Sequence, residues 1–210
     1  MEGEINFTEN QRDALKEIGN ICAGNAATAL SQLLDRKITI VVPRILFIPI
    51  EEVPKIVGGE DKLVVGLMLR VLGDLPSNII FIFNQRDALI LASFMTGKQV
   101  NDSMVISDME QSALKEVGVI LANAYLGVLG NFVGLGLVPT VPELIVDMAG
   151  AIVDYILIQL SATSQYALLV ESEFREPTTS VTGHFFLIPN PEGLEIILRA
   201  INEQSIDRGP

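Results

Sequence analysis

The sequence predicts an α+β protein with an internally duplicated, pseudo-twofold design, in which a mostly antiparallel sheet carries two long exposed helices. The phrase LKEIGNICAGN at residues 15–25 returns as LKEVGVILANA at 114–124, 99 residues later. Each copy lies in a stretch of helical periodicity, and stretches with the alternation of half-buried strands follow it. With 210 residues, of which 49% are hydrophobic and 19% charged, the chain can bury a core without disulfides.

The first predicted element is a helix over about residues 8–34, because Thr8 and Gln11 have the spacing of a capping box. At about 100° per residue, its side chains divide into two faces. Its core face is expected to hold Leu15, Ile18, Cys22, Ala26, Ala29 and Leu33. Its outward face is expected to hold Asp13, Glu17, Asn20, Gly24, Thr28 and Ser31. Glu17 and Asn20 are therefore predicted to be neighbours on the surface.

Strands are predicted near 37–48, 63–71 and 78–84, and the strand–turn–helix pattern of 78–94 closes the first half with a helix. Ser107 and Glu110 form a second capping box, 99 residues after the first, so a second long helix begins there. Strands near 138–147, 166–174 and 180–188 and a closing helix within 183–201 follow. We expect the two halves, 1–100 and 101–210, to pack about a pseudo-twofold axis as one compact domain.

The run from 117 to 142 carries no charged residue and is long enough to span a bilayer. It also contains Asn123, Asn131, Pro139 and Pro142, which a lipid-facing helix tolerates poorly. We therefore expect a helix buried in the protein core, followed by a strand, and no membrane insertion. The first ten residues, MEGEINFTEN, are acidic and polar, unlike a signal peptide, which favours a cytoplasmic location.

The formal net charge of −12 leaves no basic footprint for nucleic acid and favours a basic or locally cationic partner. Cys22 lies in an apolar stretch and is interpreted as a buried structural thiol, and His184 as an ordinary strand residue. One cysteine and one histidine argue against a zinc site, and no metal site is expected.

The pair formed by Glu17 and Asn20 has two interpretations. An outward Glu and Asn on a helix are usually no more than a solvated face. A carboxamide, however, donates and accepts hydrogen bonds at once, so it can hold a water molecule. Orienting a water is enough for phosphoryl hydrolysis, because its loose transition state asks mainly for positioning. Gly24, one turn on, costs about 1 kcal/mol against Ala in a helix interior, so either another backbone approaches it or a ligand needs the room.

These residues resemble the signature of the CheC/CheX/FliY phosphatases of chemotaxis, which is Asp or Ser, three residues, Glu, two residues, Asn, twenty-two residues and Pro. In the first half every position matches: Asp13, Glu17, Asn20 and Pro43. In the second half three positions match: Ser112, Glu116 and Pro142. Val119 stands where the second asparagine belongs. The resemblance covers essentially the whole chain, and the length and the twofold repeat favour CheC over the shorter CheX.

The resemblance implies that the chain removes phosphate from the aspartyl-phosphate of the chemotaxis response regulator CheY. The regulator supplies a Mg²⁺ ion and its own lysine, so no cofactor belonging to the phosphatase is expected. By carry-over, Asn20 positions the attacking water and Glu17 pairs with that lysine. Asp13 and Gly24 then lie on the helix face that meets the substrate.

The second site is expected to be degenerate, because Val119 cannot hydrogen-bond a water. Asn123 does not replace the missing amide, since it lies about 10.5 Å of helical rise beyond Glu116, against about 4.5 Å for the spacing of the first site. Two roles then stay open for Glu116: it binds the regulator without contributing to catalysis, or it contributes only to packing.

The resemblance also implies a second partner, CheD, a receptor deamidase that CheC relatives often bind. The segment 147–160, DMAGAIVDYILIQL, has no evident counterpart in the first half and is interpreted as a partner surface, with a plain core helix or strand as the alternative. Another class of function also stays open, a non-catalytic adaptor that binds CheD or the flagellar switch, and so does a bare structural domain. A monomer is expected.

Overall fold

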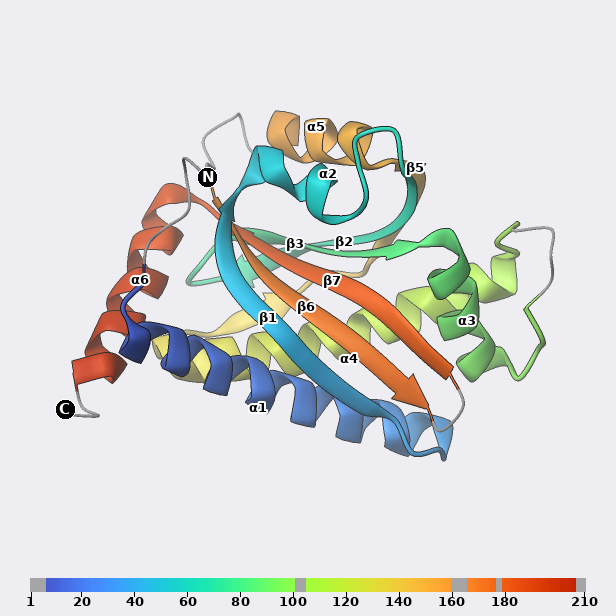
Figure 1. The fold of residues 1–210 in the computed structure, drawn as a ribbon, viewed down its shortest axis with the longest axis horizontal. Coiled ribbons are helices and arrows are strands. Elements are labelled where there is room, and N and C mark those ends of the chain that lie inside the picture. The colour runs from blue at the N-terminus through green and yellow to red at the C-terminus, as the bar shows by residue number, and fades with distance from the viewer. Residues whose placement is uncertain (1–6, 101–104, 160–165, 177–178, 207–210) are drawn as a thin grey trace.

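The computed structural model describes residues 7–100, 105–159, 166–176 and 179–206. The order of elements in the first half recurs in the second: a long helix, an edge strand, a shorter helix, two strands and a closing helix (Figure 1). The first set is α1 (Glu9–Leu34), β1 (Thr39–Pro49), the 3₁₀ turn η1 (Ile50–Glu52), α2 (Val53–Ile56), β2 (Leu63–Gly73), β3 (Ser77–Asn84) and α3 (Gln85–Thr96). The second set is α4 (Asp108–Val133), β4 (Leu137–Pro139), β5 (Glu143–Met148), α5 (Ala149–Gln159), β6 (Tyr166–Glu176), β7 (Thr179–Pro189) and α6 (Pro191–Ile206).

The strands form one antiparallel sheet in the order β1-β6-β7-β3-β2-β4, with β5 pairing alongside β4 on β2. At its centre β3 pairs with β7, so that Phe81 lies opposite Phe185. At its edges the halves exchange strands, because β1 pairs with β6 and β5 pairs with β2. The predicted α+β fold with a mostly antiparallel sheet is therefore confirmed, whereas the division at residue 100 stays a prediction.

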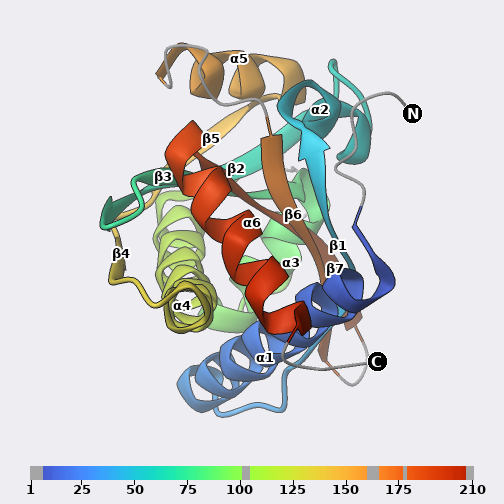
Figure 2. The same cartoon turned by 90° about the vertical axis from the view of Figure 1, so that its left-hand side faces the viewer.

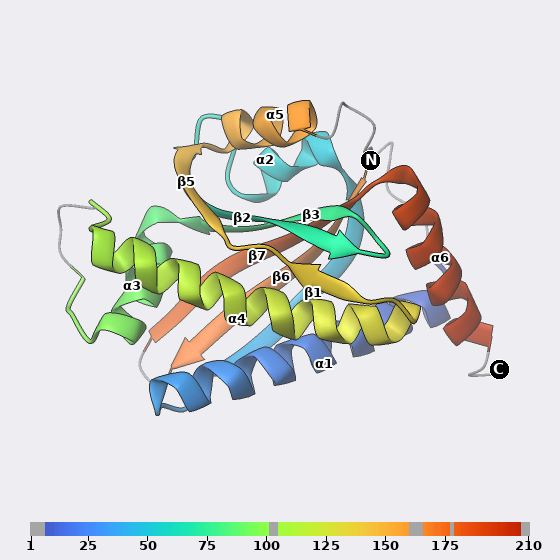
Figure 3. The same ribbon diagram turned by 180° about the vertical axis from the view of Figure 1, so that it is seen from behind.

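The helices cover the two faces of the sheet unequally. The long helices α1 and α4 lie side by side in opposite directions across one face, and α3 and α6 close the ends of this layer (Figures 1 and 3). The short helices α2 and α5 cover the other face, as Figure 2 shows from the side. The larger core, between the sheet and the long helices, includes Tyr125 of α4 packed on Phe81 and Phe185. The smaller core lies under α2 and α5.

The predicted starts of both long helices, and the predicted end of the first at Leu34, are confirmed. Thr8 caps α1 and Ser107 caps α4, each with a complete capping box. Both helices run for 26 residues and end at a left-handed residue, Asp35 with φ 49° and Gly134 with φ 71°. Start and end are thus repeated 99 residues apart, which indicates that the capping signals set the length of both helices.

The helix α4 contains residues 117–133 of the uncharged run whose length meets the test for a membrane span. By length and composition alone it would pass that test, and within the described part of the chain no other helix does. In the structure it packs on the sheet and on α1, with Leu114, Val117 and Leu121 buried. The prediction of a core helix followed by a strand is confirmed.

The strand predicted over 138–147 is wrong as a single strand, because it is broken into β4 and β5. The residues between Pro139 and Glu143 exceed by one those between their partners on β2, Val71 and Met68. The same irregularity occurs in β1, whose register on β6 shifts between Val41 and Arg44. A proline lies in each bulge, where its missing N–H removes no ladder hydrogen bond.

Two further expectations need correction. Leu33, expected in the core, is 47% exposed, and Ala29, also expected there, is only half-buried, while Leu30 and Ile38 fill the core instead. The chain folds back after α1, and the Ser31 hydroxyl both accepts from the N–H and donates to the carbonyl of Ile38, which leaves Leu33 on the open side. The segment 147–160, of which residue 160 lies outside the described residues, does have a counterpart. The segment of η1 and α2 begins 99 residues before α5, and α2 contacts α5.

Candidate functional site

The residues predicted to carry the chemistry lie together on the exposed face of α1. Asp13, Glu17, Asn20 and Gly24 are all exposed. The Asn20 amide makes no hydrogen bond to any residue that the structure describes, so its donor and acceptor atoms face solvent. A Cβ atom added to Gly24 would meet nothing within 4 Å. No neighbouring backbone approaches Gly24 within 4 Å. Of the two explanations for this glycine, the structure therefore agrees with open space, one turn along the helix from Asn20.

The bulged edge strands fix the position of each long helix. A Cβ atom on Gly19 would lie 3.1 Å from Val42 Cγ1 in the bulge of β1. A Cβ atom on Gly118, its counterpart in α4, would lie 3.3 Å from Leu67 Cδ1 and 3.4 Å from Pro142 Cγ. Each helix therefore rests on the sheet at its glycine, beside the proline-containing bulge. This contact gives a structural reason for the long spacing between the helix motif and Pro43.

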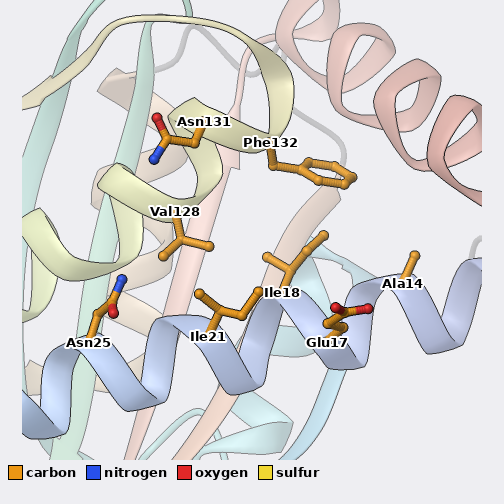
Figure 4. A pocket seen from close by; sticks show the side chains of 8 residues that line it. All are labelled: Ala14, Glu17, Ile18, Ile21, Asn25, Val128, Asn131 and Phe132. Carbon is orange, nitrogen blue, oxygen red and sulfur yellow. The ribbon is translucent and has the colours of Figure 1, made fainter.

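Glu17 also lines a pocket between α1 and α4, with a volume of about 310 Å³. Figure 4 shows Glu17, Ile18 and Ile21 reaching from α1 toward Val128 and Phe132 on α4. The complete lining is Ala14, Glu17, Ile18, Ile21, Asn25, Val128, Asn131 and Phe132. Asn20 lies outside this lining, so Glu17 belongs both to the exposed pair and to the pocket.

Sequence reasoning did not find this pocket. In the sequence, Asn131 argues only against a membrane span, and no pattern assigns a role to Asn25 or Phe132. A signal was present, because Asn25 and Asn131 are polar residues within runs of small and apolar residues. What brings them to Glu17 is the antiparallel packing of α1 on α4 (Figure 3), which the pattern of either helix alone does not specify.

The face of α4 that corresponds to the motif face of α1 has different side chains. Glu116 is exposed, as Glu17 is, and Val119 is half-buried. The Asn123 side chain donates from Nδ2 to the carbonyl oxygen of Val119 at 2.8 Å. Its amide is therefore turned back onto its own helix, in contrast to the Asn20 amide.

The remaining reactive side chains lie away from this face. Cys22 is buried, and burial raises the pKa of its thiol to about 12, so it is uncharged at neutral pH. His184 is half-buried in β7, and burial lowers its pKa. In the described ranges, no cluster of three or more His, Cys, Asp or Glu side chains could hold a metal ion. Neither Cys22 nor His184 therefore adds a reactive group to the exposed pair of Glu17 and Asn20.

Comparisons with known proteins agree on one family. A family model described as the CheC-like family matches residues 11–46, the span that contains the whole first motif. The chain is 34% identical to the CheY-P phosphatase CheC of Bacillus subtilis, over 92% of this chain and 94% of that protein. It is 35% identical over 91 residues to the flagellar motor switch phosphatase FliY of the same organism, which is 43% of this chain and 23% of that protein.

Among solved structures, the fold is similar to that of Thermotoga maritima FliY, with a TM-score of 0.72 and 17% sequence identity. This match covers 95% of the present chain and 100% of the other. The repeated helices, the exchanged sheet, the motif on α1 and the near full-length match to CheC lead to one conclusion: the chain belongs to the CheC-like family.

Proposed function

We propose that the chain is a phosphatase that hydrolyses the aspartyl-phosphate of CheY at a single site on α1. The observation that carries this proposal is the Asn20 amide, which is exposed, makes no hydrogen bond to any described residue and lies three positions from Glu17 on the 26-residue helix α1. The names of the relatives, CheY-P phosphatase CheC and flagellar motor switch phosphatase FliY, support the reaction class.

In the proposed reaction, the face of α1 docks on phosphorylated CheY and Asn20 enters its phosphorylation site. The amide oxygen accepts a hydrogen bond from the attacking water, and the amide N–H donates to a neighbouring oxygen. The water oxygen forms a bond to phosphorus as the bond between phosphorus and the aspartyl oxygen breaks, which yields inorganic phosphate and the free carboxylate. No covalent intermediate on this chain is involved.

Glu17 has a separate part in the proposal. Its carboxylate pairs with the lysine of the regulator's phosphorylation site, which holds the two proteins in register. The Mg²⁺ ion that neutralises the phosphoryl oxygens belongs to the regulator, so this chain needs no metal of its own. The space beside Gly24 gives the regulator room to approach the helix.

The experiment compares the dephosphorylation of purified phosphorylated CheY by the wild type, Asn20→Ala and Asn123→Ala. Removing the water-positioning amide is expected to lower the rate about a hundredfold. Asn123→Ala is the matched control, because it removes an exposed helical asparagine whose amide is bonded to its own helix, and it is expected to keep the wild-type rate. A wild-type rate in Asn20→Ala would overturn the proposal.

A second candidate function, an adaptor that binds CheD, has one observation in its favour. The surface of β5 and α5 exposes apolar side chains, Met148 at 50%, Tyr155 at 40% and Ile158 at 76%. We propose this surface as the contact for CheD in either case. Purified wild type that binds CheD but does not dephosphorylate CheY would favour the adaptor. A monomer in the cytoplasm is proposed for both functions.

A further inference from the structure

Glu17 stands at the border between two surfaces of α1. Relative to Glu17, Asn20 lies about 60° around the helix axis in one direction, while Asn25 lies about 80° around in the other. The first direction leads to the exposed pair, and the second leads into the pocket against α4. A protein that reaches Glu17 therefore also covers the mouth of this pocket.

The lining of the pocket defines the kind of group that fits it. Ile18, Ile21, Val128 and Phe132 give apolar walls on both sides (Figure 4). The polar groups are one carboxylate, from Glu17, and two neutral amides, from Asn25 and Asn131. A carboxylate and amide oxygens accept hydrogen bonds, and no cationic side chain lines the pocket. This combination fits a lysine or arginine side chain, whose aliphatic stem packs on apolar surface while its charged end meets oxygen atoms.

The matching place in the second half is built differently. The residues 99 positions from Asn25, Asn131 and Phe132 are Ala124, Gln32 and Leu33. Leu33 is 47% exposed, whereas Phe132 is half-buried against the pocket. The C-terminal end of α4 lies beside the intact motif of α1, and it differs from the C-terminal end of α1 at these positions. The helix α4 itself lacks the motif asparagine.

We propose that the end of α4 completes the first site, and that the pocket formed with Glu17 binds a lysine or arginine side chain from the surface of phosphorylated CheY. Asn131 and Phe132 are then binding residues of a site whose reacting groups lie on α1. A carboxylate has about four acceptor positions, so Glu17 can bond this side chain and the lysine of the phosphorylation site together. The net charge of −12 adds a general attraction for a basic surface. This inference rests on the proposed function, because it takes CheY as the partner.

The test adds one negative charge to the pocket. Asn131→Asp is expected to tighten binding to CheY about threefold at low salt, the size typical of an exposed charge pair. Gln32→Asp is the matched control, because it adds the same charge at the equivalent position of the other half and changes the net charge equally. It is expected to bind as the wild type does. A gain in affinity cannot arise from a variant that fails to fold.

Binding is measured by calorimetry with CheY held in its activated form by beryllium trifluoride, which does not depend on hydrolysis. The gain should disappear in about 1 M salt, where charges are screened beyond about 3 Å. Asn131→Leu, which removes the amide oxygen, is expected to weaken binding and raise the KM for phosphorylated CheY while kcat is kept. Gln32→Leu is its control.

Equal affinity of the two aspartate variants, or weaker binding by Asn131→Asp, would overturn the inference. The two proposals fail in different ways. If the wild type binds activated CheY but does not dephosphorylate phosphorylated CheY, the phosphatase proposal fails, and the affinities still decide on the pocket.

Discussion

The helices α1 and α4 share the features that determine their place in the fold, and they differ in the side chain that is proposed to carry the chemistry. Both have a capping box, 26 residues, a glycine on a bulged edge strand and an outward glutamate. Only α1 has an asparagine three residues after this glutamate. In α4 that position is Val119, and the amide of the nearby Asn123 is bonded to its own helix. Asn20 makes no contribution to packing, so its counterpart can be lost without loss of fold, whereas the glycines and caps cannot be replaced as freely.

The largest effect expected on the activity of the second half comes from restoring its missing amide. In an Asn20→Ala background, Val119→Asn should raise the rate of CheY dephosphorylation about tenfold, because it places an amide three residues after Glu116, as in the first motif. The measurement is single-turnover loss of phosphate from CheY. Val119→Ala in the same background is the control and should give no gain.

If Val119→Asn also gives no gain, the two helices differ in more than the amide. The next difference is then the pocket, where Ala124, Gln32 and Leu33 stand in place of two asparagines and a phenylalanine. Adding Ala124→Asn and Gln32→Asn would separate these contributions.

The next effect concerns two glycines of α1 with opposite surroundings. Gly19→Leu should destabilise the fold by about 2 kcal/mol, because the new side chain would overpack the contact with Val42. Gly24→Ala should stabilise it by about 1 kcal/mol, because the added methyl group meets nothing within 4 Å. Urea unfolding of the two variants measures both. Equal destabilisation by the two would contradict the assignment of Gly19 as the contact point.

The smallest expected effect is a difference between the two capping boxes in how their stabilisation of the fold depends on pH. The Ser107 hydroxyl and backbone N–H both donate to the Glu110 carboxylate, at 2.6 and 2.7 Å, and these bonds lower its pKa. Because the pKa of Glu110 is lower in the folded protein, its carboxylate stabilises the fold above the ordinary carboxyl pKa near 4.5. This stabilisation is lost as the pH falls through the pKa of the folded state. The box of α1 uses the uncharged Gln11, which does not titrate.

At pH 7, Thr8→Ala and Ser107→Ala should each cost about 1 kcal/mol of unfolding free energy. At pH 3 the cost of Ser107→Ala should shrink while that of Thr8→Ala stays the same. Urea titrations at the two pH values measure both costs. A cost of Ser107→Ala that does not change with pH would contradict the part assigned to the Glu110 carboxylate.

The features that were predictable from sequence are those set by local chemistry. The capping boxes located the starts of both long helices to within a residue, and alternation located five of the strands to within a few residues. The outward face of α1 was also found, apart from the half-buried Ser31. Each of these depends on residues close together in the chain.

The features that were missed depend on contacts between distant segments. Leu33 was misplaced because the turn after α1, held by Ser31 and Ile38, decides which side of the last helical turn is covered. The break between β4 and β5 follows from their register on β2. Asn131 and Phe132 reach Glu17 only because the sheet holds the two long helices antiparallel, and no pattern within either helix encodes that crossing.

The exchange of edge strands has a consequence for synthesis on the ribosome. Residues of β1 pair with residues of β6 that are made more than a hundred positions later. At about 5–20 residues per second, β1 waits roughly ten seconds for its partner strand, with its hydrogen-bonding groups unpaired. A regular edge strand of eleven residues would invite pairing with other nascent chains during that time. Pro43 offers no N–H for such pairing, so the residue that later lies in the bulge beside α1 is also expected to lower the tendency of the growing chain to aggregate.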